Sequence, residues 1–332
     1  MASLENVVDR DFEGSARLDV YVSECLGAIG RSRLKARLKT ATVNGKNVKL
    51  SCRIKAGDRI SLDWEDEKPL SLTAEDIPLK ILYEDERILV IDKQQGLLVH
   101  PGAGNPSGTV VNALLWQLEK RGKSSCLSLS AGRPGIVHRL DKDTSGVLLC
   151  ALDDDALAYL SNEFKMRRVK KHYLALVQGC PPQRSGRIET LLTRDPKDRK
   201  KFAVSQSGGK EARSSWRVLA SWGSHSLLLM GLETGRTHQL RVHLRHIGCP
   251  ILGDPIYGTR DKRFPSVSLM LHARRLGIRL PSSTVQASSA RAKGVVSPLS
   301  PGTWKVFTAR IPRRLKLILR DLDRHPGRSC PL

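Results

Sequence analysis

The sequence lacks the long hydrophobic segments that would place it in a membrane. Its longest apolar runs, at residues 88–91 and 227–230, are far shorter than the roughly 20 residues that a transmembrane helix needs. The first residues, MASLENVVDRDFEGSARLD, are acidic and contain no apolar stretch of the kind found in secretory signals. We therefore expect a soluble cytoplasmic protein that does not associate with membranes.

Cysteine pairs and nucleotide-binding signatures are also missing. No C-x-x-C pair occurs among the seven scattered cysteines, which stand at positions 25, 52, 126, 150, 180, 249 and 330. Such spacing is not typical of a zinc site or a disulfide framework and predicts reduced thiols. Neither G-x-x-x-x-G-K-[ST] nor G-x-G-x-x-G is present, and G-x-S-x-G is absent too. These absences argue against nucleotide binding and against a serine hydrolase.

Acidic residues are scarce relative to basic ones. The chain has 33 Asp and Glu but 56 Lys and Arg, which gives a formal net charge of +23. A protein this basic usually binds a polyanion, because neutralising phosphates releases counterions. Its 332 residues, 40% of them hydrophobic, are enough for about two domains with real cores.

Residues 14–62 are predicted to form a small basic domain. Their eleven Lys or Arg against three acidic residues give +8. Apolar residues at helical spacing predict two helices, and the Asn-Gly and Gly-Asp pairs that follow predict turns between short strands. Arg33, Lys35 and Arg37 lie on the exposed side of the second helix. This arrangement indicates contacts with an RNA backbone, with a merely solvated basic helix as the alternative.

An acidic stretch with two prolines, residues 63–80, reads as a linker. Residues 81–325 then alternate between predicted strands and helices and are expected to form one larger domain. A basic Gly-containing hairpin over residues 194–213, which includes Lys210, is suited to a sugar-phosphate backbone. Residues 281–303, rich in Ser, Ala, Pro and Gly, are expected to be a hairpin insertion without chemistry of its own.

The most informative stretch is GIVHRLDKDTSGVLLCA, residues 135–151. Apolar runs on either side predict two supporting strands, and the polar loop between them holds Asp141. Gly146 lets the backbone turn into the second strand. A buried carboxylate needs a cation beside it. The segment TGRTHQLR, residues 234–241, contains two arginines that could supply the positive charge. From the residues alone, Asp141 is either a nucleophile or base, or a structural residue that caps a turn.

Three histidines invite a metal hypothesis. His238, His243 and His246 follow H-x4-H-x2-H spacing, which matches no established ligand signature, and Arg236 and Arg241 flank the first of them. Packing or phosphate contacts explain these histidines better than metal binding does.

The loop sequence HRLDKDTSGVLLCA closely resembles the signature H-R-L-D-x-x-T-S-G of the RluA/RluD family of pseudouridine synthases. Residues 14–62 resemble the αL RNA-binding module of the small-subunit ribosomal protein S-four. With similar blocks further along, the resemblance covers about residues 14 to 320; these blocks are GLLVHPGAGN, KKHYLALVQG, LETGRTHQLRVHLRHIGCPILGDPIYG and LMLHARRLGI. The chain departs from the family at Gln94, where Lys-Pro is usual, and in a shortened stretch between RSRL and VNG.

The resemblance implies an α+β fold with a mixed, largely antiparallel central sheet flanked by helices. It implies isomerisation of uridine to pseudouridine in RNA: the glycosidic bond breaks, the uracil rotates, and it is rejoined through carbon five. Because nothing is hydrolysed or oxidised overall, neither a cofactor nor a metal is expected.

By the same resemblance, Asp141 is the nucleophile, attacking either the sugar or the base. Tyr173 stacks on the uracil, and Arg236 pairs with Asp141. Arg139 fills the space left by the flipped uridine, and its neighbour His138 contacts RNA. Apolar side chains are expected to wall the pocket, namely Leu140, Leu240 and Ile251.

The expected partner is RNA, in particular large-subunit ribosomal RNA, free or within a pre-ribosomal particle. A tRNA uridine is an alternative substrate, and a non-catalytic RNA-binding factor on the same scaffold is an alternative function. The protein is expected to act as a monomer.

Overall fold

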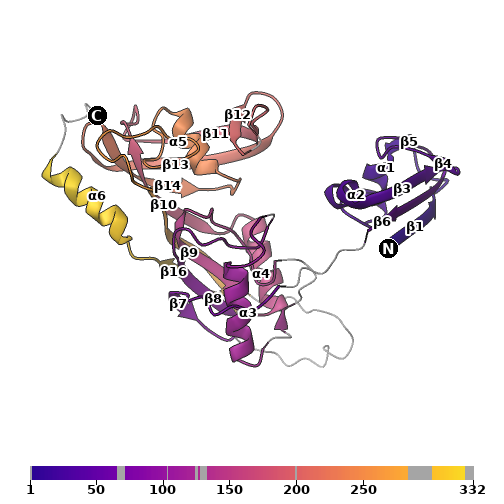
Figure 1. The fold of residues 1–332 in the computed structure, drawn as a ribbon, viewed down its shortest axis with the longest axis horizontal. Coiled ribbons are helices and arrows are strands. Elements are labelled where there is room, and N and C mark those ends of the chain that lie inside the picture. Colours follow the sequence, from indigo (N-terminus) through magenta and orange to yellow (C-terminus); the bar gives the residue numbers. More distant parts are fainter. Residues whose placement is uncertain are drawn as a thin grey trace. The chain divides into compact units, whose positions relative to one another are not determined.

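A computed structural model describes residues 2–65, 72–102, 104–123, 126–127, 133–198, 200–282 and 301–325. The chain divides into two compact units, Met1–Ser71 and Leu72–Leu332. Figure 1 shows the first unit in indigo to violet and the second in the remaining colours.

The first unit combines short helices with a small sheet. A four-stranded antiparallel sheet has the order β1-β6-β3-β4, and a separate ribbon pairs β2 with β5. In chain order the elements are β1 Ala2–Val7, β2 Ala16–Arg17, α1 Leu18–Val20, the π-helical turn η1 Tyr21–Cys25, α2 Arg31–Arg37, β3 Leu38–Val43, β4 Lys46–Asn47, β5 Arg53–Ile54 and β6 Arg59–Trp64. The apolar periodicity is confirmed, because Leu18, Val22 and Leu34 are fully buried in this unit's own core.

The second unit is built on one large sheet with the order β12-β11-β13-β14-β10-β15-β9-β8-β7, and β16 pairs with β15 beside it. Only the β9–β15 pairing is parallel among the ladders of this sheet in the described residues. The elements are β7 Ile81–Glu84, β8 Ile88–Lys93, α3 Val110–Lys120, β9 Ser145–Ala151, α4 Asp154–Lys165, β10 Lys170–Gln178, β11 Ser185–Arg194, β12 Phe202–Ser205, β13 Lys210–Ser221, β14 His225–Leu232, α5 Gln239–His246, β15 Leu271–Pro281, β16 Pro301–Thr308 and α6 Arg313–Arg324. The mixed, largely antiparallel α+β fold is confirmed.

Strand β9 is buried on both faces. Leu148 and Cys150 pack in the same core as Leu114 of α3, whereas Val147 and Leu149 pack in a second core with Leu160 of α4. Since successive strand residues point to opposite faces, an unbroken apolar run belongs in a sheet covered on both sides. This strand is the rigid support of the loop that precedes it.

The domain boundaries differ from the expected ones. The predicted linker 63–80 begins inside β6, because Asp63 and Trp64 pair with β1 and β3. The first unit also starts earlier than residue 14, since β1 supplies a sheet strand. At the other end, the Asn112 side chain donates to the Thr73 carbonyl at 2.8 Å, which ties the segment before β7 to α3. The second unit therefore begins before residue 81.

Strands β15 and β16 form the predicted hairpin at its base, with Arg275 opposite Thr308. The insertion that they frame, residues 283–300, lies outside the described residues. Cys25, Cys52, Cys126, Cys150 and Cys249 are free, which agrees with the expectation of reduced thiols at these positions. Cys330 lies outside the described residues.

Among the described residues, none of the helices combines the length and the apolar character needed to cross a bilayer.

Candidate active site

The loop before β9 carries Asp141 and is held by hydrogen bonds to its backbone. The Lys93 ammonium, 1% exposed, donates to the backbone oxygens of Lys142 at 3.0 Å and Leu97 at 2.8 Å. Burial lowers the pKa of Lys93 to about 8, although Asp141 and Asp143 oppose the shift. The Thr144 amide also donates to the Asp141 carbonyl at 3.1 Å. These bonds explain how a short polar loop holds one conformation. The strand predicted before the loop is reduced to a single bridge, Ile136 to Cys150.

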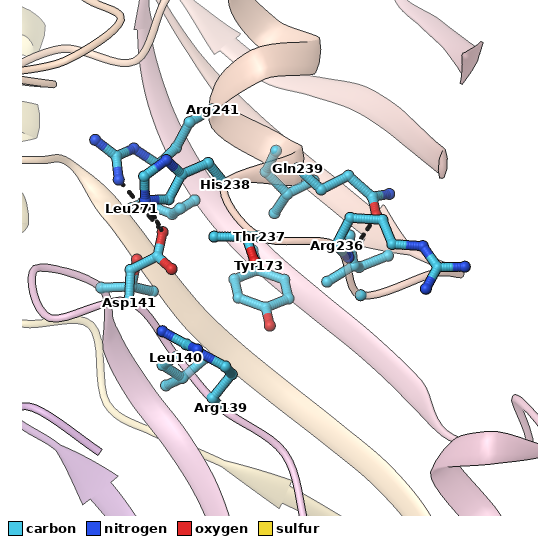
Figure 2. Close-up of a pocket in the computed structure, with 14 residues that line it drawn as sticks. Arg139, Leu140, Asp141, Tyr173, Arg236, Thr237, His238, Gln239, Arg241 and Leu271 are labelled. Carbon is cyan, nitrogen blue, oxygen red and sulfur yellow. Dashed lines mark hydrogen bonds and ion pairs between the residues drawn. The ribbon is translucent and has the colours of Figure 1, made fainter. Parts of the chain in front are cut away.

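Asp141 lies in a small pocket of about 90 Å³ that is open to solvent. The walls come from the Asp141 loop, β10, the end of β14, the turn after it, α5 and β15 (Figure 2). The lining residues are Arg139, Leu140, Asp141, Thr144, Tyr173, Leu232, Gly235, Arg236, Thr237, His238, Gln239, Leu240, Arg241 and Leu271. Leu140 and Leu240 are where they were expected. Ile251 is instead buried in the core, in a bridge to Val177.

The cation beside Asp141 is Arg241. Its Nη1 lies 3.4 Å from Asp141 Oδ2, while its Nε and Nη2 donate to the buried Asp254 carboxylate at 2.8 and 2.7 Å. Burial alone would raise the pKa of Asp254, but the bonds from Arg241 and from two backbone amides outweigh it and lower that pKa. Arg241 thus bridges one structural carboxylate and one carboxylate that faces the pocket.

The expected pair of Arg236 with Asp141 is wrong. The Arg236 Nε donates to the Glu211 carbonyl at 3.0 Å, and Figure 2 shows its guanidinium directed away from Asp141. The reason is local geometry: Arg236 precedes His238, whose φ of 57° turns the chain into α5. Arg241 lies beyond that turn, on the buried side of the helix. Arg236 still lines the pocket.

Tyr173 lies in the pocket, as expected for a ring that meets a base. It stands in β10 opposite Met230 and Ala273, next to a register shift between His172 and Tyr173. The side chain is buried, at 7% exposure. Burial raises the pKa of the Tyr173 hydroxyl strongly, and the nearby Asp141 carboxylate adds to the effect. The hydroxyl therefore stays protonated at neutral pH.

His138 is a structural residue rather than an RNA contact. Its Nε2 accepts the Leu149 amide at 3.0 Å, and its ring stacks on Phe164 with centroids 4.7 Å apart. Burial lowers the pKa of His138 to about 3, so the ring is neutral. The next residue, Arg139, is exposed at the pocket and suits the role expected of it.

The remaining predicted RNA contacts lie outside the pocket. Arg33, Lys35 and Arg37 are on α2 in the first unit, where Arg33 and Lys35 are exposed. Lys210 is exposed at the start of β13, beside the β11–β12 hairpin. Their contacts with RNA stay predictions.

The three histidines considered for metal binding have other partners. The Nδ1 and Nε2 atoms of His243 lie 3.0 Å from the hydroxyls of Ser214 and Thr190, respectively. His238 Nδ1 lies 2.9 Å from the Tyr257 hydroxyl, and His246 is exposed at the end of α5. Within the described ranges, no group of three or more His, Cys, Asp or Glu side chains is arranged to hold an ion.

Sequence reasoning missed Asp254 and Tyr257 and did not assign Arg241 or His238 to Asp141. The segment GDPIYG carries both Asp254 and Tyr257, and in the sequence it stands out only as part of a block that resembles the family. An acidic residue between Gly and Pro, within an otherwise basic domain, was the available signal for a buried partner of an arginine.

The chain is similar to several known proteins. Residues 87–246 match the family model of RNA pseudouridylate synthase. The chain is 42% identical over 325 residues to the ribosomal large subunit pseudouridine synthase D of Borreliella burgdorferi, covering 95% of this chain and 93% of that protein. The chain belongs to the RNA pseudouridine synthase family.

Other synthases support the assignment across the whole chain. The ribosomal large subunit pseudouridine synthase D of Xanthomonas campestris pv. campestris is 35% identical over 333 residues, covering all of this chain and 96% of that protein. The solved human RNA pseudouridylate synthase domain containing 4 has the same fold, with a TM-score of 0.55, 24% identity, and coverage of 74% of this chain and 93% of that one. This pseudouridine synthase is therefore an isomerase that acts on RNA.

Proposed function

We propose that this synthase isomerises uridines of large-subunit ribosomal RNA, with Asp141 as the nucleophile. The observation that carries the proposal is the Asp141 carboxylate in an open pocket, beside the Tyr173 ring and the Arg241 guanidinium. The ribosomal substrate is supported by relatives named ribosomal large subunit pseudouridine synthase D. A tRNA uridine is the second candidate substrate.

In this proposal each pocket residue has a distinct part. The uridine leaves the RNA stack and enters the pocket, since a base inside a stem cannot be reached otherwise. Arg139, exposed at the rim, fills the space that the base vacates. Tyr173 stacks on the uracil, a role for which a buried aromatic ring with a polar tip is suited. Arg241, already ion-paired to Asp254, holds the Asp141 carboxylate in place.

The overall reaction balances without a second reactant. The bond from nitrogen one of uracil to the ribose is exchanged for a bond from carbon five, and the proton lost at carbon five is matched by one gained at nitrogen one. Asp141 begins and ends as a carboxylate. The enzyme acts as a cytoplasmic monomer, and the exposed cations on α2 and at Lys210 contribute to RNA binding.

Pseudouridine mapping in total RNA tests the substrate. Cells that carry the gene are compared with cells that lack it, and each site is read in ribosomal and transfer RNA. The expected result is the loss of one or a few sites in large-subunit ribosomal RNA alone. Loss of sites in tRNA alone would show that the substrate is tRNA. An unchanged pseudouridine map would favour a non-catalytic RNA-binding factor.

A further inference from the structure

His238 occupies a backbone conformation that few histidines adopt. Its φ of 57° and ψ of 15° place it in the left-handed region directly before α5. The turn is secured by the Gln239 side-chain oxygen, which accepts the Arg236 amide at 3.0 Å and the Thr234 hydroxyl at 2.8 Å. Residues held in such conformations concentrate at functional sites, where the surrounding bonds offset the strain. The strain here places the imidazole in the pocket.

A chain of hydrogen bonds fixes the tautomer of His238. The Phe202 amide donates to the Tyr257 hydroxyl oxygen at 2.8 Å, and the same hydroxyl lies 2.9 Å from His238 Nδ1. Tyr257 is buried, so its proton needs an acceptor, and Nδ1 is the one that the geometry provides. A neutral His238 therefore carries its proton on Nε2.

The neutral form of His238 is the prevailing one at pH 7. Burial lowers the pKa of His238 first, and the cations Arg241 and Arg139 lower it further, whereas Asp141 and Asp254 act in the opposite direction. The rings of Tyr257 and Phe202, which pack edge-to-face against the imidazole, add no charge. The imidazole is thus a hydrogen-bond donor through Nε2 without being a counter-ion.

Arg241 and His238 both face the same carboxylate oxygen of Asp141. Arg241 Nη1 lies 3.4 Å and His238 Nε2 3.9 Å from Asp141 Oδ2, so Oδ1 remains for the uridine (Figure 2). These distances are longer than tight hydrogen bonds, as is common before substrate closes a site.

We propose that His238 is a positioning residue that holds the Asp141 carboxylate through Nε2–H, and that Tyr257 and the Phe202 backbone keep the imidazole in place. The proposal rests on Asp141 being the nucleophile. It also links the β11–β12 hairpin, predicted to grip RNA, to the orientation of the reacting carboxylate, since Phe202 is the first residue of β12.

The substitution His238→Asn isolates the proposed bond. Asparagine tolerates the left-handed backbone, and its side-chain oxygen can accept the Tyr257 hydroxyl, but it has no atom at the place of Nε2. Under saturating RNA we expect kcat to fall about tenfold to a hundredfold, the range for a lost hydrogen bond to a charged group. KM for the RNA and the melting temperature should stay near the wild-type values.

Three further variants serve as a rescue, a control and a test of the contact with Tyr257. His238→Gln returns an N–H close to the position of Nε2, so it should recover part of the lost kcat. His246→Asn makes the same substitution at the exposed end of α5 and should leave kcat unchanged. Tyr257→Phe removes the hydroxyl that orients the imidazole, and combining it with His238→Asn should slow the enzyme no further than His238→Asn alone.

The outcomes separate this inference from the proposed function. If wild-type and Asp141→Asn proteins form pseudouridine at the same rate, the nucleophile assignment fails and the inference fails with it. If Asp141→Asn is inactive while His238→Asn keeps the wild-type kcat, only the positioning role is overturned. Independent, multiplying losses from His238→Asn and Tyr257→Phe would refute the link through Tyr257.

Discussion

Arg241 contacts two carboxylates at once, which its planar guanidinium group makes possible. Two of its nitrogens bind Asp254, and the third faces Asp141. A lysine could not make these contacts together, because its ammonium is a single point of charge. From the sequence, an arginine of TGRTHQLR was expected beside the Asp141 carboxylate, and the family resemblance pointed to Arg236. Arg241 could not be identified in advance, because the turn at His238 that directs it toward Asp141 depends on tertiary contacts. The sequence did place three residues in the pocket. Arg139 and Asp141 lie in the motif HRLDKDTSG, and Tyr173 lies in the predicted strand that became β10.

Arg241→Lys tests this division of labour. We expect kcat to fall about a hundredfold and the unfolding free energy to drop by about 2 to 4 kcal/mol, because the buried Asp254 carboxylate loses its paired donors. Steady-state kinetics and urea unfolding measure both effects. Arg236→Ala should instead keep stability within about 0.5 kcal/mol and mainly raise KM for RNA. A larger loss of kcat in Arg236→Ala than in Arg241→Lys would contradict the pairing.

The buried histidines predict how stability depends on pH. Burial lowers the pKa of His138 to about 3 and those of His243 and His272 to about 4, against an ordinary 6.5. Below pH 6.5 the unfolded chain binds protons that the folded chain does not, so folding stability is lost as pH falls from 6.5 toward 4. Each histidine contributes about 1.4 kcal/mol per pH unit in that window.

Urea unfolding at pH 7, 6 and 5 should show this decline. The variant His243→Gln, which loses one of the three titrating groups, should show a shallower decline than the wild type. Stability that is constant or rises between pH 7 and 5 would be inconsistent with neutral buried imidazoles.

At the level of elements, the parallel contact between β9 and β15 positions the loop that carries Asp141. Gly146 pairs with Ala273 at a φ of 118°, so the backbones approach too closely for a side chain. The sequence predicted β9 and the turning role of Gly146 from the apolar run and the glycine. It could not predict that β15, some 125 residues later, lies beside it, because strand pairing depends on tertiary packing.

Gly146→Ala should therefore be strongly destabilising. A methyl group there would lie 2.2 Å from the Ala273 carbonyl oxygen, and only a backbone shift relieves that overlap. We expect a loss of about 3 kcal/mol or more in the unfolding free energy, with loss of activity. Gly122→Ala is the matched control: its φ is also positive, at 64°, but no described atom lies within 4 Å. It should cost only about 1 to 2 kcal/mol. Equal effects of the two substitutions would refute the close approach.

At the scale of the whole molecule, charge is divided unequally between the two units. Residues 1–71 contain 13 Lys or Arg and 11 Asp or Glu, so nearly all of the net charge of +23 lies in the second unit. The predicted domain 14–62 is basic only because its limits exclude the acidic flanks. Those limits were misplaced because β1 and the end of β6 carry polar residues and join the sheet through backbone pairing, which composition does not reveal.

Deleting residues 1–71 tests the role of the first unit. We expect the truncated enzyme to bind ribosomal RNA more weakly. The salt dependence of its RNA affinity should be smaller, but most of it should remain, because the second unit carries most of the charge. Under saturating RNA, kcat should stay close to the wild-type value. Binding to a labelled transcript between about 50 and 200 mM salt measures this. If the truncated enzyme bound as tightly at every salt concentration, the first unit would have no part in RNA binding.

We propose above all that the Asp141 carboxylate carries out the isomerisation. The most direct measurement is pseudouridine formation in a large-subunit ribosomal RNA transcript by wild-type, Asp141→Asn and Asp143→Asn proteins, with RNA affinity measured alongside. Asp143 lies in the same loop but does not line the pocket, so it controls for the loss of a neighbouring charge. We expect no turnover by Asp141→Asn with nearly unchanged RNA affinity, and most of the wild-type turnover by Asp143→Asn. Sustained turnover by Asp141→Asn would contradict it.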